Sequence, residues 1–126
     1  MIKVKIDTKE IFHVIYFEEK ELTANMAEEL NLLVANVQEA ENKSLIFNMK
    51  NVEVLSTEFA QKLNEIRLEL NAQNKSFVIC EISSGVREIL KHLEDFESIN
   101  ITPTESEAWD IVQMEEIERE LGMDLE

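Results

Sequence analysis

Short apolar runs alternate along this chain with segments whose apolar residues recur every three or four positions. The apolar runs predict strands at residues 2–6, 11–17, 44–49, 76–82 and 98–102. The periodic segments predict helices at residues 22–40, 59–70, 83–93 and 104–121. Because parallel strands need a crossover segment between them, this order predicts an α/β fold. We expect a mixed, mostly parallel central sheet of about five strands, with about four helices.

The length and composition indicate one domain spanning residues 1–126. Apolar residues make up 44% of the chain, which argues against disorder despite its high charge. Two glycines and one proline are too few for a turn-rich sandwich or barrel.

The last predicted helix extends past what a small sheet can cover. We therefore expect a core at residues 1–112 and an extended acidic helical tail at residues 113–126. Met114, Ile117 and Leu121 form an apolar stripe on that helix. Either this stripe packs on the flank of the domain or it waits for a partner, and self-association is one such use.

The charge balance bears on the class of partner. With 27 acids against 12 bases, the chain carries a net charge of −15. Such a surface repels phosphate backbones and anionic lipids, so we expect no nucleic acid and no membrane as a partner. A protein with a basic face fits better.

The single cysteine and the N-terminal residues indicate a cytoplasmic location. Cys80 lies in the apolar run "FVICEI", where a reduced and buried thiol is expected. The start "MIKVKID" lacks the long apolar region of a secretory signal, and no apolar run approaches the roughly 18 residues of a membrane span.

The groups that enzymes use are missing. The chain has no glycine-rich phosphate loop, and no CxxC or HExxH spacing, so we expect no cofactor and no metal. His13 is interpreted as a packed or edge histidine of a strand and His92 as a solvated one. A thiol within an apolar strand lacks the electropositive setting of a nucleophile. No catalytic residue is predicted, and the chain is not expected to be an enzyme.

One junction stands out, the stretch "NVEVLSTEFAQKL" at residues 51–63. An apolar run meets Ser56, Thr57 and Glu58 where a helix is expected to begin. Ser56 or Thr57 could cap the unpaired amides of the first helical turn. The same geometry also suits a phosphoryl group on a hydroxyl, because the helix dipole stabilises negative charge there.

Motifs spread over the chain resemble a known family. Asn48 ends a predicted strand, and "VEVL" at residues 52–55 precedes the junction. "SSGV" at residues 83–86 and "PTESEA" at residues 103–108 open the last two helices, while "EKELTANMAEEL" at residues 19–30 opens the first. In this order and spacing they resemble a STAS domain of the anti-sigma factor antagonist type, over almost the whole chain.

The resemblance implies site residues. The family's D-S-S-G signature aligns with Ser56, Thr57, Glu58 and Phe59, and its phosphorylated residue is the first hydroxyl, which corresponds to Thr57. Thr23, after Leu22, replaces another acid of the family. The partner-binding residues implied in this way are Thr23, Asn48, Ser56, Thr57, Glu58 and Gln61.

The resemblance also implies a function in transcription regulation by partner switching. In such systems the unphosphorylated domain binds a serine/threonine kinase that is also an anti-sigma factor, and thereby frees the sigma factor. A phosphatase resets the phosphorylated domain. The alternative is a non-switching structural subunit of a lipid-transport ATPase complex or a multi-STAS signalling particle. A small α/β enzyme is a third reading, which the missing catalytic groups disfavour.

Overall fold

The computed structural model describes residues 1–122. Its strands are β1 (Val4–Thr8), β2 (Phe12–Phe17), β3 (Glu21–Leu22), β4 (Ser44–Asn48), β5 (Val54–Leu55), β6 (Phe77–Cys80) and β7 (Asn100–Thr102). Its helices are α1 (Met26–Ala40), α2 (Thr57–Ala72), α3 (Ser84–Leu90) and α4 (Glu105–Glu120), with a short 3-10 turn at Phe96–Ser98.

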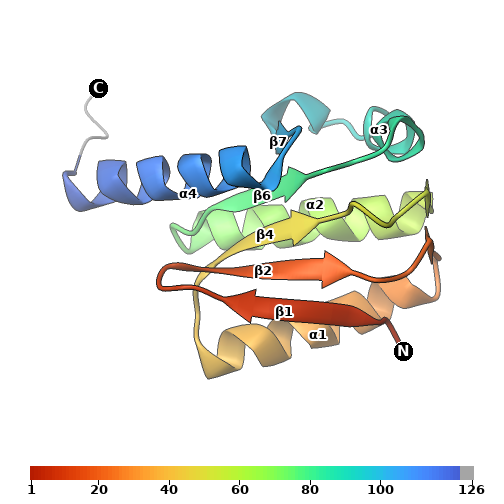
Figure 1. Cartoon of the computed structure of the whole chain (residues 1–126), viewed down its shortest axis with the longest axis horizontal. Helices are drawn as coiled ribbons and strands as arrows, with labels where there is room; N and C mark the ends of the chain where they lie inside the picture. Colours follow the sequence, from red (N-terminus) through yellow and green to blue (C-terminus); the bar gives the residue numbers. More distant parts are fainter. Residues whose placement is uncertain (123–126) are drawn as a thin grey trace.

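The central sheet has five strands in the order β1-β2-β4-β6-β7 (Figure 1). The hairpin pair β1 and β2 is antiparallel, whereas β2, β4, β6 and β7 pair in parallel. This arrangement confirms the predicted mixed, mostly parallel sheet with four helices.

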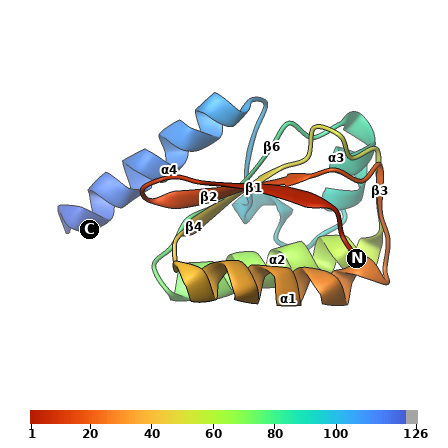
Figure 2. The ribbon, with the colours of Figure 1, turned by 60° about the horizontal axis from the view of Figure 1, so that its bottom comes forward.

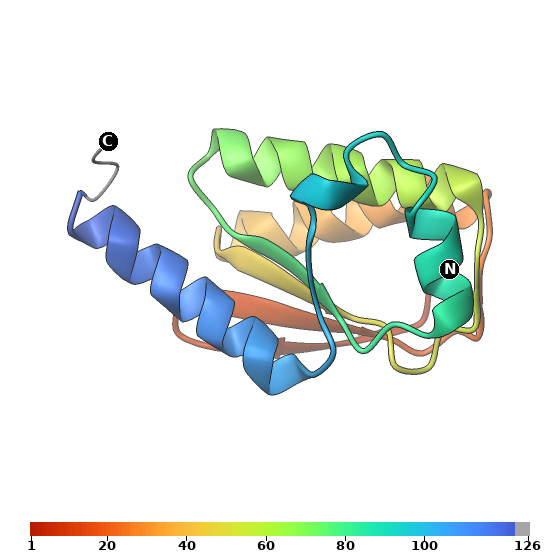
Figure 3. The same ribbon diagram turned by 90° about the horizontal axis from the view of Figure 1, so that it is seen from above.

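Helices cover both faces of the sheet. Figures 2 and 3 show α1 and α2 side by side on one face and α4 alone on the other. Along β4, Leu45 and Phe47 belong to the core on the α1/α2 side, while Ile46 packs with Ala108 and Val112 of α4. Because successive strand residues point to opposite faces, burial on both faces explains why the strands are apolar at almost every position.

A second, two-stranded sheet was not predicted. β3 and β5 pair in parallel at one end of the main sheet. Because Glu21 and Leu22 belong to β3, the first long helix begins at Met26 rather than near Leu22. Its N-cap is Asn25, whose side chain makes no capping hydrogen bond. The third helix is also shorter than predicted, ending at Leu90.

The last helix begins after the N-cap Thr104, whose side-chain oxygen accepts a hydrogen bond from the backbone N–H of Glu107. It runs without a break through the predicted boundary between core and tail. The exposed fractions of Met114, Ile117 and Leu121 are 61%, 54% and 67%. The alternative in which this stripe packs on the flank of the domain is therefore wrong. Residues 123–126 of the predicted tail lie outside the described residues.

Candidate functional site

The start of α2 forms the first part of the candidate site. Ser56 has extended backbone angles and its Oγ accepts a hydrogen bond of 3.0 Å from the backbone N–H of Phe59. Of the two hydroxyl residues, Ser56 is therefore the N-cap. Thr57 is the first residue of α2 and is exposed, and within residues 1–122 its hydroxyl has no hydrogen-bond partner. The Thr57 hydroxyl is accessible at the positive end of the helix dipole.

The small sheet brings a distant segment to this junction. Leu22 of β3 pairs with Leu55 of β5, and the backbone N–H of Ser56 donates to the carbonyl oxygen of Leu22 over 2.9 Å. The carboxyl ends of parallel strands meet at one edge, so Thr23 follows β3 at the same place where Ser56 follows β5. The two residues thus lie at one site although they are far apart in the sequence.

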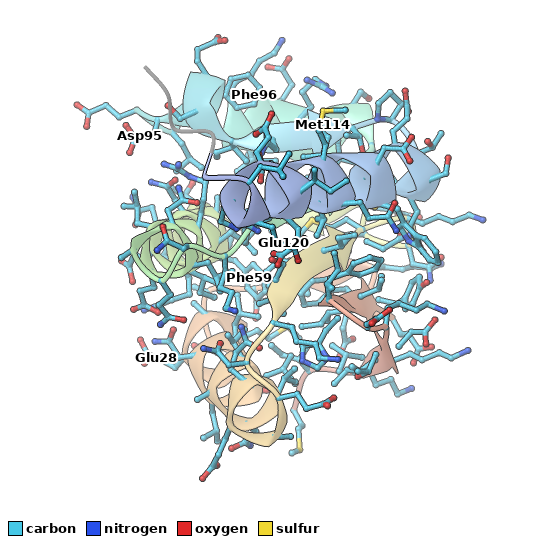
Figure 4. The ribbon with its side chains drawn as sticks, turned by 90° about the vertical axis from the view of Figure 1, so that its left-hand side faces the viewer. Glu28, Phe59, Asp95, Phe96, Met114 and Glu120 are labelled. Carbon is cyan, nitrogen blue, oxygen red and sulfur yellow. The ribbon has the colours of Figure 1, made fainter. Side chains whose placement is uncertain are left out.

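The first two turns of α2 separate an exposed face from a buried one. Thr57, Glu58 and Gln61 are exposed, and Thr57 and Gln61 share a face because they are four residues apart. Phe59 is fully buried beneath α2 (Figure 4). Its ring centroid lies 5.9 Å from that of Phe17. The phenylalanine at the fourth position of the signature therefore anchors the start of α2 in the core.

Asn48 has a different environment from the other predicted site residues. Its side chain is buried, with an exposed fraction of 6%. Its Nδ2 donates to Glu105 Oε1 over 3.0 Å, and its Oδ1 accepts from the backbone N–H of Lys50 over 3.0 Å. The structure brings Thr23, Ser56, Thr57, Glu58 and Gln61 to one surface, whereas the amide of Asn48 is used inside the domain.

The glutamate that Asn48 contacts is a structural centre that the sequence reading missed. Glu105 Oε2 accepts hydrogen bonds from the Tyr16 hydroxyl over 3.1 Å and from Trp109 Nε1 over 2.9 Å. The backbone N–H of Glu105 donates to Glu81 Oε2 over 3.0 Å. In the sequence, the one sign of this role is that Glu105 lies in the first turn of the last predicted helix. Acids are common in first turns because they interact favourably with the helix dipole, so the position does not distinguish Glu105.

The same network affects two ionisable groups. Burial, followed by the hydrogen bond to the Glu105 carboxylate, raises the pKa of Tyr16 to about 12. Burial, followed by the charges of Glu105 and Glu81, raises the pKa of Cys80 to about 12. The Cys80 thiol is thus protonated at neutral pH, which does not favour nucleophilic chemistry.

The helix α3 packs closely against the loop that leads into the junction. Its N-cap Ser83 accepts a hydrogen bond from the backbone N–H of Val86 over 3.2 Å. A Cβ atom on Gly85 would lie 3.1 Å from the carbonyl oxygen of Glu53. Glycine at this position therefore allows the close approach that places α3 beside β5.

The buried histidine has a structural role. His13 is buried and makes hydrogen bonds through Nδ1 with Thr8 Oγ1 and through Nε2 with the Glu41 carbonyl oxygen. Within residues 1–122, no group of three or more histidine, cysteine or acidic side chains is placed to hold a metal ion. No helix in this part of the chain has the length and apolar character needed to cross a membrane.

Most of the chain matches the model of one protein family. The family model of the STAS domain matches residues 4–108. The chain belongs to the STAS domain family. The matched range includes the junction, the small sheet and the start of α4.

Solved structures share this STAS fold at low sequence identity. The anti-sigma factor antagonist SpoIIAA in its unphosphorylated form is 17% identical with a TM-score of 0.74, covering 88% of this chain and 96% of that chain. A variant of RsbS from Moorella thermoacetica is 20% identical with a TM-score of 0.72, covering 88% of this chain and 95% of that chain. A chain from the stressosome, described as a signal integration and transduction hub, is 14% identical with a TM-score of 0.65, covering 86% of this chain and 96% of that chain. No curated protein sequence matches this chain.

Proposed function

We propose that this STAS domain is a regulatory binding module of the anti-sigma factor antagonist type, acting in the cytoplasm. Its binding surface is the junction formed by Thr23, Ser56, Thr57, Glu58 and Gln61, with Asn48 supporting it from inside. Its partner is an anti-sigma factor that is also a serine/threonine kinase. The observation that carries this proposal is the exposed Thr57 at the first position of α2. Its hydroxyl makes no hydrogen bond within residues 1–122.

Phosphorylation of Thr57 would switch this surface. The partner kinase transfers the γ-phosphoryl group of ATP to the Thr57 oxygen, which loses its proton, and ADP leaves. The phosphate adds roughly two negative charges at the positive end of α2. Glu58, also exposed, opposes that gain by like-charge repulsion. The added charge changes the surface that the kinase binds, and a phosphatase restores the hydroxyl.

The domain itself is proposed to supply no catalysis. Its one thiol is buried and has a raised pKa, and both nitrogens of His13 are engaged in structural hydrogen bonds. The acidic surface suits a partner with a basic face, in line with the net charge of −15.

The test is a set of affinities for the purified kinase partner. We expect wild type and T57A to bind it, and T57E to bind at least about tenfold more weakly, because a fixed charge imitates the phosphate. E97A, which changes an exposed acid in the loop before β7, serves as the matched surface control. Equal affinities of wild type, T57A and T57E would refute the switch. If both T57A and T57E lost binding and the kinase did not phosphorylate the wild-type chain, the junction would be a docking surface without a phosphorylation switch.

A second candidate function is a non-switching structural subunit of a larger assembly. Two observations favour it: Glu58 places a permanent charge beside Thr57, and α4 exposes an apolar stripe. A stable complex that forms equally with wild type, T57A and T57E, and whose mass shows several STAS subunits, would support this function over the switch. Co-purification with an ATPase would indicate the transport assembly in particular.

A further inference from the structure

The helix α4 has two faces of different character. Ala108 and Val112 point to the sheet and are fully buried, whereas Met114, Ile117 and Leu121 are exposed. These three apolar residues follow each other at spacings of three and four, which is the pattern of one seam of a coiled coil. We call this set the outer seam.

Hydrogen bonds hold α4 so that the outer seam points to solvent. Glu115 Oε1 accepts from Ser76 Oγ over 2.5 Å, and Glu115 Oε2 accepts from Asn100 Nδ2 over 3.3 Å. Arg119 Nη2 donates to Ser76 Oγ over 3.2 Å. At the other end of α4, Glu105 accepts hydrogen bonds from Tyr16, Asn48 and Trp109. The contacts at both ends oppose a rotation of α4 about its axis that would bring the outer seam to the sheet. These hydrogen bonds therefore favour the orientation of α4 in which the outer seam is exposed.

Acidic side chains flank the outer seam. With Met114 at position a of a heptad, Ile117 takes d and Leu121 the next a, which places Glu118 at e and Glu120 at g. Both glutamates are exposed, and neither takes part in an ion pair within residues 1–122. Figure 4 shows Met114 and Glu120 leaving α4 on different sides. The basic residue of this segment, Arg119, faces inward to Ser76.

These charges discriminate between two kinds of occupant. Against a second copy of α4, parallel packing would bring e against g and antiparallel packing would bring e against e and g against g. In an antiparallel pair centred on this segment, Glu118 would lie near Glu118 and Glu120 near Glu120, which is destabilising, whereas in a parallel pair Glu118 would face Gln113 of the preceding heptad. A second copy of α4 therefore supplies no basic partner for these acids in either direction. A helix with basic residues at e and g pairs with these acids in either direction and covers the seam with its own apolar residues.

We propose that the outer seam of α4 binds a basic amphipathic helix of a protein partner. The surface is separate from the junction, because α4 lies on the opposite face of the sheet from α2 (Figure 3). A partner held at the seam would leave Thr57 accessible. This surface therefore joins the domain to a second protein irrespective of the switch.

The test uses a fluorescein-labelled helical peptide of about three heptads, with leucine or isoleucine at a and d and lysine at e and g. We expect saturable binding to the wild-type chain and at least about fivefold weaker binding to E118K/E120K, since two favourable pairs become repulsive. I117E should weaken binding by about tenfold or more, because it introduces a charge into the seam. A second peptide with glutamate at e and g should bind far more weakly than the first.

The matched control is E28K/E39K, which makes the same charge change on two exposed positions of α1. The helix α1 lies far from α4, as the label of Glu28 in Figure 4 shows. It should change the affinity less than about twofold if contact rather than net charge decides binding. Equal effects of the two charge reversals, or equal binding of both peptides, would overturn the proposal. It would also be overturned by no binding of the lysine peptide, or by sedimentation showing a wild-type dimer that I117E dissociates, which would assign the seam to a second copy.

Discussion

The backbone N–H of Ser56 donates a 2.9 Å hydrogen bond to the carbonyl oxygen of Leu22, which ties the start of α2 to the end of β3. This bond places Thr23 at the junction and orients the first turn of α2 on which Thr57 is exposed. The candidate binding surface therefore depends on the register of two strands of only two residues each.

Replacing Ser56 tests the cap. We expect S56A to lower the free energy of unfolding by about 1 kcal/mol, because the N–H of Phe59 loses its acceptor. S56D should retain most of the stability, since aspartate is an equally good N-cap. T57A should change stability by less than about 0.5 kcal/mol, because its hydroxyl caps nothing within the described residues. Urea unfolding measures all three, and a larger loss in T57A than in S56A would reverse the assignment.

Replacing Glu105 tests the network beneath the sheet ends. E105A removes the acceptor of Asn48, Tyr16 and Trp109, and we expect it to cost about 3 kcal/mol because partly buried donors lose their partner. The exposed E118A on the same helix should stay within about 0.5 kcal/mol. Chemical denaturation monitored by Trp109 fluorescence gives both values. A loss in E105A as small as that in E118A would show that the network adds little.

The raised pKa values predict a loss of stability at alkaline pH. Folding favours the neutral forms of Tyr16 and Cys80, whose ordinary pKa values of 10.0 and 9.0 both rise to about 12. Their contributions are therefore complete below pH 9 and are lost as the pH rises from 9 through 12. Denaturation at about pH 8 and about pH 11 should show a smaller difference for Y16F and for C80A than for wild type. Identical pH slopes in all three proteins would contradict this prediction.

Replacing Gly85 tests the contact between α3 and the loop before β5. Alanine normally favours a helix over glycine by roughly 0.5–1 kcal/mol. Here a Cβ atom 3.1 Å from the Glu53 carbonyl oxygen forces the two segments apart, so we expect G85A to be destabilising by about 1 kcal/mol. S84A, the neighbouring exposed position of α3, should be close to neutral. Thermal unfolding compares the two, and a stabilised G85A would show that the loop yields easily.

Local patterns in the sequence were enough for the main elements. The alternation of apolar runs with periodic segments predicted the strand and helix order, because burial of strands on both faces leaves a continuous apolar run. The pair β3 and β5 escaped, since strands of two residues carry no period. The sequence also did not predict that Asn48 is buried and Thr57 exposed. Both are polar residues at the end or start of an element, and only their tertiary neighbours differ.

By itself, the sequence determined the five strands of the main sheet, the four helices, the acidic charge and the position of Thr57 at a strand–helix junction. These features depend on nearby residues and on composition. Tertiary structure alone decided which side chains meet. The pairing of β3 with β5 places Thr23 beside Ser56. The packing of α4 on the sheet lets Asn48 donate a hydrogen bond to Glu105 and leaves Met114 and Ile117 exposed to solvent. The reason is that contacts between distant segments follow from the packing of helices on the sheet, which no local period records.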